Sequence, residues 1–130
     1  MKPELTYLTW VTLLTALLWV PYILDRLRVR VLPDTVGYPT DPKPQSPWAV
    51  RLKAAHANAA ENLVVFATLV LVAHALGIAN AAVASAAMLY FWARVVHALA
   101  YTLAWPWART LAFAAGFVAQ MMVAWQILAR

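Results

Sequence analysis

Four apolar segments, each long enough to cross a lipid bilayer, limit what this chain can fold into. A spanning helix needs about 20 mostly apolar residues, and the candidates run over residues 5–24, 48–77, 81–101 and 107–128. The chain is 65% hydrophobic and only 12% charged, whereas soluble domains carry about 25% charged residues. We therefore expect an all-α membrane protein, with residues 1–130 forming one bundle of four transmembrane helices.

The segments between these spans carry turn and interface residues. Residues 77–80 are expected to form a short turn, and residues 105–107 place two tryptophans around a proline, which suits a turn at the membrane interface. Residues 33–47 hold five prolines, which lack the N–H donor that a helix needs, so we expect a surface loop without helix there. The first apolar run is longer than the ~7–15 residues of a signal-peptide core, so we expect it to remain as a span.

Basic residues are concentrated ahead of the second span. Six Lys or Arg residues and three Asp residues lie between positions 25 and 53. By the positive-inside rule, this first loop and the third loop, which precedes Arg109, face the cytoplasm, and both termini face the other side. For Arg28, Arg30 and Arg130, setting this topology is a sufficient explanation. No basic–aromatic pattern typical of nucleic-acid binding is present, so no nucleic-acid partner is expected.

The composition also excludes several kinds of chemistry. The chain has no cysteine, which excludes disulfides, thiolate metal sites and a cysteine nucleophile. Its three histidines are scattered and do not show metal-ligand spacing, so we expect no metal site. Three glycines are too few to build a glycine-rich phosphate loop. Any thiol chemistry must therefore use a thiol that belongs to a substrate.

The second span begins with charged residues, although charge in or near a membrane is costly. The segment reads WAVRLKAAHANAAENLVVFATLVLVAHALG over residues 48–77. As one helix it would be about 43 Å long, at 1.5 Å per residue, against a hydrocarbon core of about 30 Å. Its polar first third must therefore protrude toward the cytoplasm or pack against protein.

One face of this helix carries complementary polar groups. At about 100° per residue, Arg51, Asn58 and Glu61 fall on one face, whereas Lys53 and His56 point elsewhere. An arginine, an amide and a carboxylate on one stripe can bind a zwitterionic ligand. The alternative is a structural clamp between helices, with Glu61 paired to Arg51 or to the arginine of the third span. The residues alone leave both interpretations open.

The third span has a polar face of its own. Tyr90, Arg94, His97 and Tyr101 follow one another at spacings of four, three and four residues, so they lie on one face of a mostly apolar helix. An arginine inside a span must face protein or a water-filled cavity. Arg109 opens the fourth span, where a cation opposes the helix dipole, so an anionic partner is expected there.

In combination, these motifs resemble one known family. RLKAAHANAAEN followed by LVVFATLVLVAHALG, and ARVVHALAY followed by WPWARTLAF, are similar to the MAPEG family, the membrane-associated proteins in eicosanoid and glutathione metabolism, and most of all to its short bacterial members. The resemblance covers essentially the whole chain. It implies a homotrimer in the bacterial inner membrane, with glutathione as co-substrate bound between subunits near the cytoplasmic face. The implied activity is that of a glutathione-dependent transferase or peroxidase acting on hydrophobic electrophiles that arrive through the lipid.

The resemblance also assigns roles to individual residues. Asn58 and Glu61 match the asparagine and glutamate expected to hold the peptide and amino group of glutathione. Arg109 matches, within one residue of loop length, the arginine expected to face the thiol, which makes it the catalytic candidate. The other binding candidates are basic or aromatic: Arg26, with Arg28 as an alternative, Arg51, Lys53, His56, Arg94 and Tyr101.

The chain departs from the family pattern at Ala54, where members often carry an arginine, and Lys53 or Arg51 would have to replace that cation.

Two other functions use the same residues. A noncatalytic four-span protein would need them only as interhelical pairs, so whether the chain is an enzyme stays open. A proton-coupled exporter would need Glu61 to take up a proton near neutral pH, and the surrounding cations oppose this because they stabilise the charged carboxylate.

Overall fold

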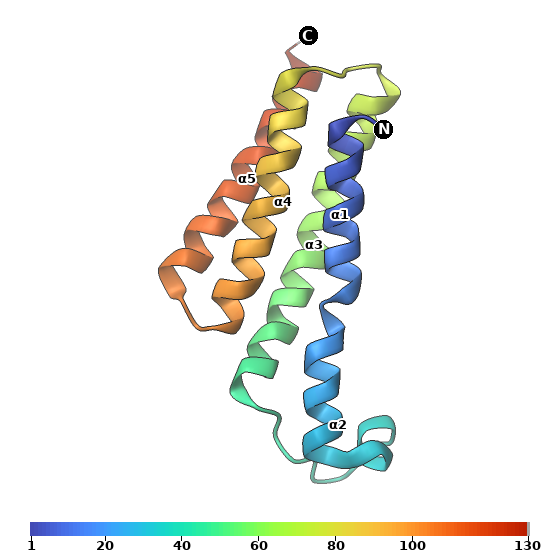
Figure 1. Cartoon of the computed structure of the whole chain (residues 1–130), viewed down its shortest axis with the longest axis vertical. Coiled ribbons are helices and arrows are strands. Elements are labelled where there is room, and N and C mark those ends of the chain that lie inside the picture. Colours follow the sequence, from blue (N-terminus) through green and yellow to red (C-terminus); the bar gives the residue numbers. More distant parts are fainter. Residues whose placement is uncertain (130) are drawn as a thin grey trace.

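Five α-helices make up the fold in the computed structural model, which describes residues 1–129. In chain order they are α1 (Pro3–Leu17), α2 (Trp19–Val36), α3 (Pro47–Ala75), α4 (Ala81–Thr102) and α5 (Pro106–Leu128). Helices α1 and α2 stack end to end, so the described chain has four helical units long and apolar enough to cross a membrane (Figure 1). The predicted four-helix transmembrane fold class is confirmed.

The first unit is longer than the expected span over residues 5–24, and it is interrupted at Leu18. Pro21 has no N–H to donate to the carbonyl four residues earlier, that of Leu17, and a proline ring crowds that position. The backbone N–H of Leu18 instead bonds to the carbonyl of Thr15 at 3.4 Å, which closes α1 with a tighter turn. The chain then continues as α2 well past Leu24.

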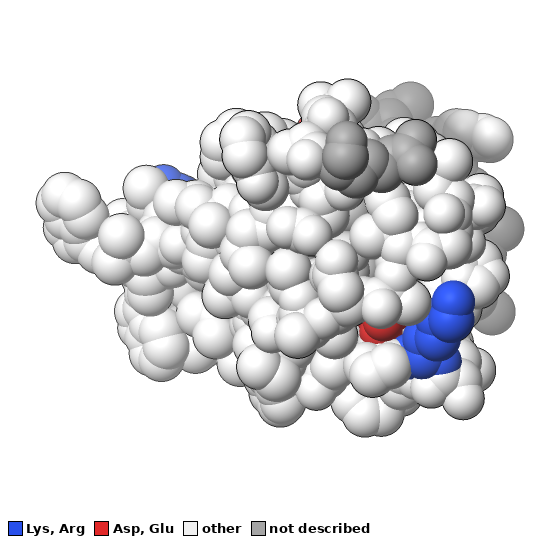
Figure 2. Space-filling view, turned by 90° about the horizontal axis from the view of Figure 1, so that it is seen from above, with Lys and Arg blue, Asp and Glu red and all other residues white. Residues whose placement is uncertain are grey.

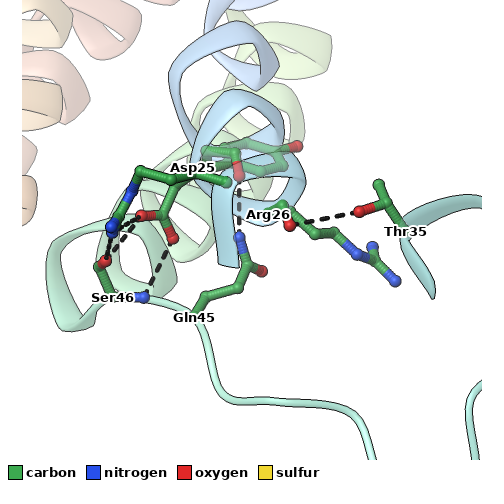
Figure 3. A network of polar contacts seen from close by, with 7 residues as sticks. Asp25, Arg26, Thr35, Gln45 and Ser46 are labelled. Atoms are coloured by element: carbon green, nitrogen blue, oxygen red, sulfur yellow. Dashed lines mark hydrogen bonds and ion pairs between the residues drawn. The ribbon is translucent and has the colours of Figure 1, made fainter. Parts of the chain in front are cut away.

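The prediction that residues 33–47 contain no helix is wrong at both ends, because α2 continues to Val36 and α3 begins at Pro47. Val31 has a non-helical backbone (φ 56°, ψ 170°), which kinks α2 so that a short final stretch up to Val36 begins anew. Pro33 falls in the first turn of that stretch, where its missing N–H would have had no partner. The hydroxyl of Thr35 donates to the carbonyl of Val31 (2.8 Å) and to that of Arg26 (3.2 Å), the second of which Figure 3 shows, and so fixes the kink.

A buried carboxylate joins the end of α2 to the start of α3. Asp25 accepts hydrogen bonds from the backbone N–H of Ser46 (3.0 Å), from its hydroxyl (2.6 Å) and from Arg28 (3.0 Å), as Figure 3 shows for Ser46. Ser46 is the N-cap residue of α3, so Asp25 satisfies a donor that would otherwise be free at that helix start. Gln45 also donates to the carbonyl of Tyr22 at 2.8 Å. These contacts hold the proline-rich loop against the bundle.

Small residues allow the helices of the bundle to approach closely. Ala112, Gly116 and Ala119 form part of the buried face of α5, and a Cβ at Gly116 would lie 3.8 Å from the ring of Tyr90. Phe66 of α3 stacks on the same Tyr90 ring, with ring centroids 3.8 Å apart. Close backbone approach supplies the van der Waals contact that drives helix association in lipid.

The two halves of the bundle differ in length. Helix α3 has 29 residues and α4 has 22, which correspond to about 43 Å and about 33 Å. In Figure 1, α2 and α3 extend well beyond the turn that joins α4 to α5, whereas at the other end the helices finish near one level with both termini. The α4–α5 turn therefore forms a step beside the projecting ends of α2 and α3.

Candidate functional site

A buried arginine links α3 to α4. Arg94 is 3% exposed, and its Nη2 donates to the side-chain oxygen of Asn58 at 2.8 Å and lies 3.3 Å from Nδ1 of His97. Asn62 donates to the carbonyl and side-chain oxygens of Asn58, at 2.9 and 3.3 Å, and its own carbonyl accepts from Gln120 of α5 at 3.2 Å. Of the two surroundings expected for the arginine of the third span, protein or a water-filled cavity, the structure shows protein.

The suggested pairing of Glu61 with Arg51 or Arg94 is wrong for the single chain. Glu61 is exposed, and the one ion pair in the described part of the chain joins Arg28 to Asp25. Glu61 is three residues from Asn58, which is a rotation of about 60° around the helix. That rotation takes the carboxylate off the face that meets α4, so Glu61 is free for a ligand or another subunit.

Two guanidinium groups border one cleft at the α4–α5 turn. The cleft has a volume of about 180 Å³ and is lined by Arg51, Tyr101, Trp105 and Arg109, with no acidic side chain among its described lining residues. The guanidinium carbon of Arg109 lies 5.2 Å from the centre of the Tyr101 ring, within the range of a cation–π interaction. Arg51 reaches across from α3, and its Nε donates to the carbonyl of Thr102 at 2.9 Å.

This cleft is suited to an anion. Arg51 uses one N–H on the carbonyl of Thr102 at the C-terminal end of α4, which is where a cation is favoured. Arg109 sits in the first turn of α5, where the helix dipole also favours a negative charge. The expectation of an anionic partner near Arg109 therefore gains a physical basis, since two cations and a helix N-terminus face one small space.

His97 connects the buried arginine to the cleft. Its ring centroid lies 5.6 Å from that of Tyr101, and its Nδ1 contacts Arg94. The sequence placed His97 on the polar face of the third span without assigning it to the site. The spacing in ARVVHALAY was the available signal, because residues three and four apart meet on one helix face.

The remaining predicted site residues lie apart from the cleft within one chain. Nδ1 of His56 lies 2.8 Å from the hydroxyl of Tyr22 on α2, and Lys53 is exposed. Arg26 projects from the side of α2 away from Asp25 (Figure 3), and its Nε is buried without a hydrogen-bond partner in the described chain. One subunit thus gathers Arg51, Tyr101 and Arg109 in the cleft and Asn58 with Arg94 beneath it, but not Arg26, Lys53, His56 or Glu61.

No group of three or more potential metal ligands is present among residues 1–129.

A sequence model of the MAPEG family matches residues 6–129. No curated protein and no solved structure matches the chain. The match covers all four membrane-spanning units, the α4–α5 turn and the polar faces of α3 and α4. The chain therefore belongs to the MAPEG family.

Proposed function

We propose that this integral membrane protein is a glutathione-dependent transferase or peroxidase that acts on lipophilic electrophiles. Membership of the MAPEG family connects it to glutathione-related chemistry. The observation that carries the proposal is the cleft with two guanidinium groups at the α4–α5 turn, bordered by Arg51 and Arg109. A tripeptide with two carboxylates and a thiol presents the anionic groups that such a cleft attracts.

The chemistry requires a thiolate, and glutathione supplies the sulfur nucleophile when it is bound. A free thiol has a pKa of about 8.5, so only a few per cent of it is thiolate at neutral pH. The guanidinium of Arg109 stabilises negative charge on a nearby sulfur and so raises the reactive fraction. Tyr101 supports this role because its ring holds the guanidinium in place. Arg51 orients a carboxylate at the other side of the cleft.

The binding site is completed by a second subunit of a homotrimer. Glu61 is a carboxylate exposed on a membrane-spanning helix, and it has no ion-pair partner in its own described chain. An exposed charge on such a helix is costly unless another polar group meets it. Glu61 of one subunit then holds the amino group of a glutathione whose anionic groups lie at the cleft of its neighbour. Lys53, His56 and Arg26 are the remaining candidates for contacts across this interface, on the cytoplasmic side of a bacterial inner membrane.

The first test measures thiolate formation directly. Purified protein in detergent is titrated with glutathione, and thiolate is read from its ultraviolet absorbance at neutral pH. We expect a saturable thiolate signal in the wild type and its loss in Arg109→Ala, because the stabilising cation is removed. Lys43→Gln is the matched control, since it removes a positive charge from an exposed residue outside the cleft. An undiminished thiolate signal in Arg109→Ala would refute the role of this residue.

A second variant tests the binding of glutathione separately from its activation. Glu61→Gln keeps the size of the side chain and removes its charge, so we expect weaker binding with an unchanged thiolate fraction at saturation. Binding of glutathione to the wild type tests the whole proposal, because Ala54 stands where family members often carry a further arginine that could hold the ligand. If the wild type does not bind glutathione at millimolar concentration, the noncatalytic alternative remains.

One observation favours that alternative. The network of Asn58, Asn62, Arg94 and Gln120 is formed within a single chain and joins three helices. It would stabilise the bundle whether or not the cleft binds a ligand.

A further inference from the structure

A buried carboxylate lies at the end of the bundle opposite the cationic cleft. Glu4, in the first turn of α1, is 3% exposed. Its Oε1 is buried and has no hydrogen-bond partner among residues 1–129. A buried polar atom without a partner is costly, and more so when the group carries charge. Glu4 therefore needs a donor that the described chain does not supply.

Glu4 borders a cleft that could admit such a donor. The cleft has a volume of about 330 Å³, and its lining includes Lys2, Asn80 and Ala84 as well as Glu4. Figure 2 looks onto this end of the molecule and shows a mostly uncharged surface, with acidic atoms recessed beside a basic side chain. The cleft is therefore open at the surface, and opposite charges lie at its border.

The polar neighbours of Glu4 are already engaged or remain outside. The side-chain oxygen of Asn80 accepts from the N–H of Val83 at 2.9 Å, and its Nδ2 donates to Gln126 at 2.9 Å. Asn80 thus caps α4 and directs one amide N–H to α5, and no hydrogen bond joins it to the buried Oε1 of Glu4. Lys2 is exposed and makes no ion pair with Glu4 in the described chain.

The position of the cleft indicates the source of its ligand. Helix α1 begins at Pro3 and α4 begins at Ala81, so the cleft lies where two membrane-spanning units end. Lipid headgroups occupy this level, since a bilayer is about 40–45 Å thick with its headgroups and about 30 Å without them. The wall contributed by Ala81 and Ala84 is apolar and continues along α4 into the span.

We propose that this cleft binds the phosphoethanolamine headgroup of a membrane lipid. The primary ammonium donates to Glu4, and the phosphate lies beside the ammonium group of Lys2. A charge-assisted hydrogen bond is about twice as strong as a neutral one. A choline headgroup carries the same charges but has no N–H to donate. A purely anionic headgroup would bring negative charge toward Glu4 without a donor.

The test compares lipids that differ only in the number of N–H donors. The full-length protein in detergent is mixed with equal amounts of phosphatidylethanolamine and phosphatidylcholine of identical chains, and bound lipid is counted by native mass spectrometry. We expect phosphatidylethanolamine to be retained at least about tenfold better by the wild type, the ratio typical of one hydrogen bond to a charged group. Stepwise N-methylation of the ethanolamine should reduce this preference and abolish it at the third methyl group.

Variants identify the residue responsible. Glu4→Gln is nearly isosteric and should bring the two lipids to equal retention. Asp34→Asn removes an exposed acid near the end of α2, at the opposite end of the bundle, and should keep the preference. Lys2→Gln should reduce the retention of both lipids by the same factor. An unchanged preference in Glu4→Gln, or equal retention by the wild type, would overturn the proposal, and the latter result is expected if Lys2 itself pairs with Glu4. Displacement of the lipid by micromolar free phosphoethanolamine would overturn the assignment to a lipid.

Discussion

Arg94 is a buried cation whose hydrogen-bonding groups contact no acid in the described chain. Its one strong acceptor is the side-chain oxygen of Asn58, at 2.8 Å, and its Nε has no partner there. In Asn58→Leu the guanidinium keeps its burial but loses this acceptor. We expect the protein to be destabilised by about 2–3 kcal/mol, the typical cost of leaving a buried charged group unsatisfied. Thermal unfolding in detergent, followed by tryptophan fluorescence, measures this.

The double variant separates the hydrogen bond from the cost of the unpaired charge. Adding Arg94→Met to Asn58→Leu removes the unsatisfied cation, so the double variant should be more stable than Asn58→Leu alone. If the two destabilisations simply added, the Arg94–Asn58 contact would have no special part in stability.

At the scale of elements, the start of α3 depends on a residue from α2. Asp25 accepts from both the N–H and the hydroxyl of Ser46, so Asp25→Ala removes a cap from α3 and releases the loop that precedes it. We expect a loss of about 1–2 kcal/mol, as for other N-cap deletions, together with faster hydrogen exchange in residues 37–46. Asp34→Ala, at an exposed position in the last turn of α2, is the control and should change neither. Unaltered exchange in Asp25→Ala would mean that the loop is held by other contacts.

The element scale also shows what the sequence could predict. Helices α3, α4 and α5 begin and end within two residues of the expected bounds, because long apolar runs stop at Gly77, Asn80 and Pro106. The kink at Val31 was not predictable, because a valine there gives no local signal for a positive φ. It exists because Thr35 and the capped loop hold the backbone in place.

The candidate site was predictable only in part, for a similar reason. Helical spacing was enough to group Arg94, His97 and Tyr101 on one face. It could not place Glu61, since the partner of a side chain depends on how neighbouring helices are rotated and on any second subunit. The contact of Arg51 with the end of α4 depends on α3 running beside that end, which packing determines.

For the whole molecule, the charge distribution makes a prediction about orientation. Six Lys or Arg residues lie between positions 25 and 53, at the end of α2, in the proline-rich loop and at the start of α3, whereas the opposite end is mostly uncharged (Figure 2). This end of the molecule should therefore face the cytoplasm. The chain contains no cysteine, which makes single-cysteine labelling free of background. In intact cells, a membrane-impermeant maleimide should label Ala79→Cys and leave Asp41→Cys unlabelled until the cells are permeabilised. Labelling of Asp41→Cys but not of Ala79→Cys in intact cells would show that the orientation is opposite to the predicted one.

The step formed by the short α4–α5 hairpin beside the longer α2 and α3 has a kinetic consequence. It keeps the cationic cleft near the membrane boundary instead of at the projecting tip. A lipophilic reactant would reach it by lateral diffusion, after partitioning that favours the bilayer by about 0.8 kcal/mol per buried CH₂ group. The concentration that governs encounter is then the number of reactant molecules per lipid, not per volume of water. Adding inert lipid at a constant total amount of reactant would lower the number of reactant molecules per lipid and so lower the reaction rate.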